Sequence, residues 1–183
     1  MDIFSFKHRI RQVSDKVQTQ FAPLPPSVLG LRPAPTVWSI AENIQHLIIV
    51  NNSYRPVFES LHAGTLRLPF IAKINPLVRF MGKSILSSVK PDNKKPIKTF
   101  PIWEPEIQEV DQGLLERFEE MQAWLSESLT DLEPIIVQNP VIYSPANKNI
   151  VYHLQTAFDI IVSHEERHLA QAQEVAFQLP SNA

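Results

Sequence analysis

The chain has 183 residues, 44% of them hydrophobic, with no cysteine and a formal net charge of −2. This length allows one sizeable core, so we expect a single domain over residues 1–183, and the weakly acidic balance argues against a general nucleic-acid binder. The lack of cysteine excludes disulfides and thiolate metal sites, and the absence of a signal-peptide pattern or a run of roughly 18 apolar residues favours a cytoplasmic protein with no membrane partner.

The first predicted helix covers about residues 3–22. Its apolar side chains recur every three or four positions, which places them on one face of a helix. These residues are Phe6, Ile10, Val13, Val17 and Phe21. Three prolines follow within five residues, and proline cannot continue a helix. We therefore expect one amphipathic helix that ends before Pro23.

The second predicted helix covers about residues 40–62. Ser39 and Glu42 have the spacing of a capping box, in which each side chain bonds a free backbone amide of the other residue. Trp38 lies just outside this start. Gly64 follows the predicted end and can take the left-handed conformation that closes many helices.

A proline-rich crossover is predicted over residues 65–104. Between residues 67 and 98 it carries eight basic side chains and one acid, a local charge of +7, whereas the rest of the chain carries −9. Short helices are expected over residues 70–89, with these side chains turned inward: Phe70, Ile74, Leu77, Phe80 and Met81. The basic surface is either a solvated face or a rim that attracts anionic ligands.

Two further helices are predicted in the second half of the chain. The third covers about residues 106–132, with an apolar stripe of Ile107, Val110, Leu114, Phe118, Met121, Leu125, Leu129 and Leu132. The fourth covers about residues 150–178, capped by Asn147 or Asn149, and no strand pattern competes with it. Four amphipathic helices of this length predict an all-α fold, a four-helix bundle.

Three histidines form a candidate metal site. His164 and His168 lie one helical turn apart at the edge of the apolar stripe of the fourth helix, so both rings can reach one ion. His46 is also a stripe-edge residue on the second helix, at a compatible height if the two helices pack antiparallel. The alternative is that these histidines are hydrogen-bonded structural residues.

Other polar residues near the histidines are candidates for supporting roles. Residues 164–168 also fit the HExxH pattern of zinc proteases, but the usual downstream third ligand is missing. Glu165 falls on the buried face, where it can anchor a ligand histidine, transfer protons or make a core hydrogen bond. Asn43 and Gln171 can orient a ligand or pack, and Arg167 is either a solvated surface residue or a substrate-binding cation.

These motifs resemble the DinB/YfiT-like superfamily of metalloenzymes. The resemblance covers essentially the whole chain, and its motif is ordered in three places: Trp38, Ser39, Glu42, His46 and Leu47 at the start of one helix, the proline-rich crossover, and His164, His168 and Gln171 in the last helix. It implies a bundle of up-down-down-up topology in which His46, His164 and His168 bind zinc, nickel or another divalent ion. Some members are thiol transferases that use low-molecular-weight thiols such as bacillithiol or mycothiol, one branch is a thiol-dependent isomerase, and many have no assigned activity.

Three classes of function follow from these observations. The first is a metal-dependent enzyme acting on a small-molecule substrate, a thiol-dependent S-transferase or a hydrolase. Because the chain has no cysteine, a thiol would have to come from a cofactor. The second is a metal- or ligand-binding bundle without turnover, and the third is a bundle with structural histidines that works by protein association. Ile48 and Ile49, expected to tilt outward, suggest a homodimer.

Overall fold

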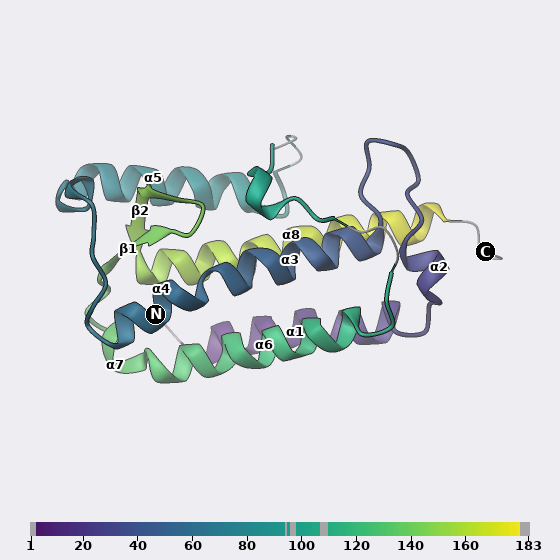
Figure 1. Cartoon of the computed structure of the whole chain (residues 1–183), viewed down its shortest axis with the longest axis horizontal. Coiled ribbons are helices and arrows are strands. Elements are labelled where there is room, and N and C mark those ends of the chain that lie inside the picture. Colours follow the sequence, from purple (N-terminus) through teal and green to yellow (C-terminus); the bar gives the residue numbers. More distant parts are fainter. Residues whose placement is uncertain (1–2, 94, 96–97, 107–109, 180–183) are drawn as a thin grey trace.

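Four helices form a bundle that is the body of the protein. The computed structural model describes residues 3–93, 95, 98–106 and 110–179. The bundle helices are α1 (Ile3–Phe21), α3 (Ile40–Ser53), α6 (Leu114–Asp131) and α8 (Leu154–Gln178). In Figure 1, α1 and α8 run in one direction and α3 and α6 run in the opposite direction, so α3 lies antiparallel to α8. The predicted helical bundle is confirmed.

The bundle interior contains two main hydrophobic clusters. One contains Phe158 near the start of α8, and the other contains Phe118 near the start of α6. Both of these rings are fully buried. Ile48 was expected to tilt outward but packs against the second cluster. Among the described residues, no helix is both long and apolar enough to cross a membrane.

The first two predicted helices are confirmed in position, but the second is divided. Its capping box between Ser39 and Glu42 is present, and Gly64 has a φ of 67° just after the last turn. The helix breaks at Tyr54 into α3 and α4 (Arg55–His62). Pro56 explains the break, because it lacks the amide hydrogen that would continue the backbone ladder. A short helix, α2 (Pro26–Leu29), follows α1.

The crossover contains a long helix that packs on the bundle. Its elements are η1 (Phe70–Lys73), α5 (Asn75–Val89) and η2 (Pro101–Trp103). Figure 1 shows α5 along the outside of α8. At Gly82, an added Cβ would lie 3.1–3.2 Å from side-chain atoms of Thr156 and Tyr152, so the missing side chain allows close packing.

The predicted inward face of this segment is wrong in part. Phe70 is 76% exposed and Phe80 69% exposed, whereas Val78 and Gly82 are buried. Ile74 is exposed too. The inward stripe of α5 is therefore shifted around the helix, because the contact with α8 requires the small residue at position 82. Lys94 of the basic segment lies outside the described residues.

The third predicted helix begins later than expected. Ile107 lies outside the described residues, and residues 112–113 form a turn before α6. Asp111 explains this start, because its carboxylate accepts hydrogen bonds from the Gly113 amide at 2.7 Å and from Arg117 at 2.8 Å. Such local side-chain bonds compete with helix formation. After α6, the short helix α7 (Glu133–Ile136) ends this part of the chain.

The start of the fourth predicted helix is replaced by a β-hairpin, so the expectation of no strand is wrong there. Strands β1 (Val141–Ser144) and β2 (Asn147–His153) pair antiparallel, with Val141 opposite His153. Helix α8 then begins at Leu154. Its cap comes from Asn139, whose side-chain oxygen accepts from the Gln155 amide at 3.0 Å, and not from the expected Asn147 or Asn149.

Candidate metal centre

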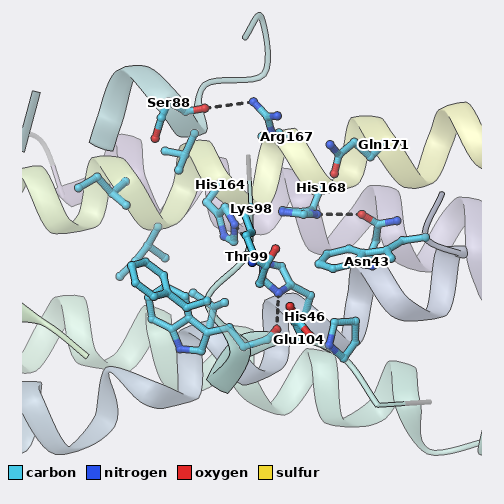
Figure 2. Close-up of a pocket in the computed structure, with 18 of the residues that line it drawn as sticks. Asn43, His46, Ser88, Lys98, Thr99, Glu104, His164, Arg167, His168 and Gln171 are labelled. Carbon is cyan, nitrogen blue, oxygen red and sulfur yellow. Dashed lines mark hydrogen bonds between the residues drawn. The ribbon is translucent and has the colours of Figure 1, made fainter. Parts of the chain in front are cut away.

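Three histidine rings converge between α3 and α8. Each of His46, His164 and His168 offers one nitrogen, and these nitrogens all lie within 4.8 Å of one another. Figure 2 shows His164 and His168 on α8 facing His46 on α3. Because α3 and α8 pack directly against each other, residues 118 and 122 positions apart in sequence meet at the same height along the bundle.

The ring of His46 is oriented by the crossover. Its Nδ1 lies 2.7 Å from the carbonyl oxygen of Trp103 in η2. A carbonyl can only accept, so Nδ1 carries the hydrogen and Nε2 keeps its lone pair. That Nε2 lies 3.2 Å from Nε2 of His164. The crossover therefore fixes which nitrogen of His46 faces the other two rings.

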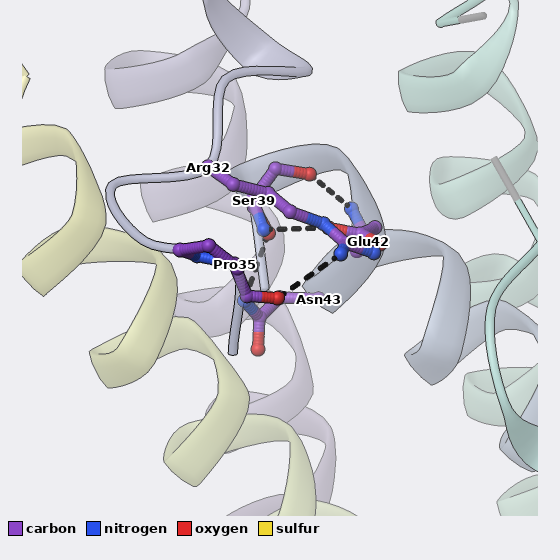
Figure 3. Close-up of polar contacts among 5 residues, drawn as sticks. All are labelled: Arg32, Pro35, Ser39, Glu42 and Asn43. Carbon is purple, nitrogen blue, oxygen red and sulfur yellow. Dashed lines mark hydrogen bonds and ion pairs between the residues drawn. The ribbon is translucent and has the colours of Figure 1, made fainter. Parts of the chain in front are cut away.

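The ring of His168 is oriented by the first turn of α3. Its Nδ1 lies 2.8 Å from Oδ1 of Asn43, and the other end of that amide donates to the Ser39 carbonyl at 2.9 Å. Figure 3 shows the contact between Asn43 and Ser39 beside the capping box of Ser39 and Glu42, with Arg32 ion-paired to Glu42. The bond to Ser39 sets the amide orientation, so Asn43 accepts from His168 and leaves the lone pair of Nε2 free.

His164 differs from the other two rings in its outer contacts. Its Nδ1 is buried and has no hydrogen-bond partner among the described residues. Burial, with smaller effects of His46 and Arg167, lowers the pKa of His164 to about 3. Burial also lowers the pKa values of His46 and His168 below the ordinary value. All three rings are therefore neutral at pH 7, which is the form that binds a metal.

The donor set fits a borderline divalent ion. Imidazole nitrogens suit zinc and nickel, whereas magnesium and calcium prefer oxygen ligands. In a tetrahedral zinc site with Zn–N bonds of about 2.0–2.1 Å, two ligand nitrogens lie about 3.3 Å apart. The 3.2 Å between the Nε2 atoms of His46 and His164 matches that spacing.

The histidines line a cleft of about 970 Å³. Its walls come from α3, α5, α8, the hairpin and the end of the crossover, where Lys98, Thr99 and Phe100 contribute. Trp38 stacks on His168, with ring centroids 5.8 Å apart and planes inclined by 25°. This volume is sufficient for a small organic molecule beside the histidines.

Glu165 lies on the other side of α8, inside the bundle. Its carboxylate is fully buried and accepts hydrogen bonds from the amide nitrogens of Asn51 at 2.6 Å and Gln122 at 3.4 Å. Burial raises the pKa of Glu165 to about 8, and these two bonds oppose the increase. Of the three roles expected for Glu165, the structure favours that of a core hydrogen-bonding residue. Its side chain is directed away from the cleft.

The other polar candidates have different surroundings. Gln171 lines the cleft one turn beyond His168. Arg167 also lines it, but the solvated position considered for this residue is wrong, because only 8% is exposed. Its guanidinium donates to main-chain carbonyls at the end of α5 and in the following loop: those of Ser88, Lys90, Asn93 and Lys95.

Sequence reasoning missed several residues around the centre. Trp103 contributes through its main-chain carbonyl, which no sequence motif marks. Trp38 was noted beside a helix start and as part of the family motif, but its stacking on His168 depends on how the preceding loop folds back. Asn51 lies two residues from the end of α3, on the face that contacts Glu165. A polar side chain within an apolar stripe was the signal by which the sequence could have identified it.

Comparison with known proteins identifies one sequence family. The chain matches the DinB superfamily over residues 9–172, which is most of its length and includes all three histidines. No curated protein and no solved structure matches the chain.

Proposed function

This chain belongs to the DinB superfamily, and from that membership and its three converging histidines we propose that it is a metal-dependent enzyme acting on a small molecule. His46, His164 and His168 would hold one divalent ion, zinc or nickel. An ion bound by three neutral imidazoles keeps its double positive charge and an open position, which suits activation of a thiol or a water molecule.

One observation carries this proposal. The Nδ1 atoms of His46 and His168 each donate to a main-chain or side-chain oxygen, so the lone pairs of both Nε2 atoms face the same small space. The Nε2 atom of His46 also lies 3.2 Å from Nε2 of His164, whose Nδ1 has no partner among the described residues. Outer partners that fix the tautomer in this way are typical of metal-ligating histidines.

The reaction class that we propose is a thiol-dependent S-transfer. The thiol sulfur would form a bond to an electrophilic carbon of the substrate, the leaving group would depart with its electron pair, and the thiol proton would pass to solvent. Because the chain has no cysteine, the thiol must be a separate small molecule.

The position of Glu165 favours S-transfer over hydrolysis. A water molecule is a weak acid, and hydrolases that activate it usually add a general base. The carboxylate next to His164 in sequence is instead bonded to Asn51 and Gln122 in the core. A thiol has an ordinary pKa of about 8.5, so it needs less assistance to lose its proton near pH 7.

The metal proposal is tested by elemental analysis of protein purified without an affinity tag. We expect close to one zinc or nickel ion per chain, and loss of that ion in His46→Ala and His168→Ala. His62→Ala is the matched control, because His62 is exposed on α4. Full metal occupancy in the His46 variant would remove this residue from the site.

The reaction class is tested with the metal-loaded protein. We expect conjugation of chlorodinitrobenzene to a small thiol faster than with the free metal ion, and loss of this rate on chelation. Metal-dependent ester hydrolysis without a thiol requirement would move the assignment to a hydrolase. Tight metal binding with no turnover on either panel would indicate a non-catalytic binding bundle.

A further inference from the structure

The cleft lining extends past the histidines to the hairpin, and most of the side chains there are apolar. On α3, Val50 and Tyr54 follow His46 at successive spacings of four residues, so all three lie on one helix face. On α8, Ile160 and Ile161 precede His164 by about one turn. Helix α5 and strand β2 complete the walls with Ile85, Val89 and Ile150. We call the space bounded by these residues the apolar arm.

Toward the hairpin the cleft is also lined by three hydroxyl side chains: Tyr54, Tyr152 and Ser144. The hydroxyls of Tyr54 and Tyr152 lie 2.7 Å apart, and both side chains are buried. None of the described residues that bound the arm is charged. The charged residues of the cleft lie beside the histidines or beyond them: Arg32, Lys98, Glu104, Arg167 and Glu174.

We propose that the apolar arm binds an aliphatic or aromatic chain of the substrate, whose reacting group lies at the three histidines. An apolar ligand loses nothing by leaving water for such walls, whereas a charged group would find no partner there. From His46 to Tyr54 the rise along α3 is about 12 Å, comparable with an extended tail of roughly eight carbons. The inference rests on the proposed function only for the position of the reacting group.

The test compares two ligand series by calorimetry with the full chain. The first series is n-alkyl hydroxamates, whose head group binds a metal, and the second is n-alkanols, which have no such head group. We expect affinity in both series to rise by about threefold to fourfold per methylene. The increase should stop near eight carbons, where the tail reaches the tyrosine pair.

Substitutions on α5 should change the tail length at which the increase stops. Ile85→Phe fills the apolar arm, so the plateau should come at a shorter tail, and Ile85→Ala should move it to a longer one. Ser87→Phe is the matched control, because Ser87 is exposed on the outer face of the same helix. If Ile85→Phe does not fold, Val89→Phe fills the arm from the last turn of α5.

The outcomes separate this inference from the metal proposal. Tail-length dependence in both series without a hydroxamate advantage would support the apolar arm and contradict the metal site. Tighter binding of hydroxamates than of alkanols, independent of tail length, would support the metal site and contradict the apolar arm. An unchanged plateau in both Ile85 variants would also overturn the inference, because the tail would then bind elsewhere.

Discussion

Asn43 connects the start of α3 to one ring of the proposed metal site. Its amide accepts from Nδ1 of His168 and donates to the Ser39 carbonyl, so it sets both the tautomer and the tilt of that ring. Loss of such an outer contact typically weakens metal binding by about 10-fold to 100-fold. Asn43 is therefore a positioning residue in the proposed site, whereas the sequence left open whether it orients a ligand or packs.

We predict that Asn43→Leu lowers zinc affinity by about 10-fold or more, because the amide oxygen that holds His168 is removed. Competition with a chromophoric chelator measures this affinity. Gln45→Leu, on the same helix but outside the described cleft lining, should bind zinc as the wild type does. Equal affinity in both variants would show that Asn43 only packs.

Glu165 gives the protein a pH-dependent stability. Its pKa is raised by burial to about 8 in the folded state, so the folded protein holds this proton more tightly than the unfolded chain does. The stability that results is complete at low pH and is lost as the pH rises through the folded value. Between the unfolded and folded pKa values the loss is roughly 1.4 kcal/mol per pH unit.

We therefore predict that Glu165→Gln removes this loss of stability. The glutamine side chain is neutral at every pH, so the free energy of unfolding of the variant should fall less between pH 6 and pH 8 than that of the wild type. Urea unfolding of the metal-free protein at several pH values measures the difference. Glu120→Gln, at an exposed position on α6, should keep the wild-type slope.

At the scale of elements, one side chain attaches the crossover to α8. The guanidinium of Arg167 donates to carbonyls at the end of α5 and in the following loop, including those of Ser88 and Lys95. This loop leads to η2, where Trp103 accepts from His46. The fold thus joins the outer end of the crossover to the same helix turn that carries His164 and His168.

We predict that Arg167→Met loosens the loop between α5 and η2. The carbonyls lose a donor that reaches several of them at once, and Arg167→Lys should restore little, because an ammonium group lacks the planar fork of the guanidinium. Hydrogen exchange should accelerate at residues 90–93 and 98–103, while the hairpin keeps its protection. Unchanged exchange in this loop would show that other contacts hold the crossover.

At the scale of the whole molecule, a bound ion would link two helices that are distant in sequence. His46 comes from α3 and the other two histidines from α8, so an ion bound by all three would stabilise only the folded chain. At a free concentration 100 times the dissociation constant, such binding adds about 2.7 kcal/mol.

We predict that zinc raises the thermal midpoint of the wild type and leaves that of His46→Ala nearly unchanged. His62→Ala should respond as the wild type does, since this residue is exposed on α4. Calorimetric scans at two zinc concentrations measure the response. A rise of equal size in all three proteins would indicate binding elsewhere on the chain.

The sequence by itself determined the features that depend on neighbouring residues. The apolar stripe of α1, the capping box of α3 and the spacing of His164 and His168 all follow from helical periodicity, which acts over one or two turns. The break at Pro56 was also readable, because proline acts locally, although the prediction ran through it. The approach of His46 to the pair was expected from matching heights, and the structure brings the three rings together.

Only the tertiary structure decided the features that depend on distant partners. The hairpin over residues 141–153 replaces a predicted helix start because its strands pair with each other and pack under α5. A helical wheel gives the angle of Glu165 but not its neighbours, Asn51 and Gln122. The carbonyl of Trp103 reaches His46 from 57 residues away. Such contacts depend on how elements pack. Every residue carries the same backbone carbonyl, so only its position in the fold makes the carbonyl of Trp103 the partner of His46.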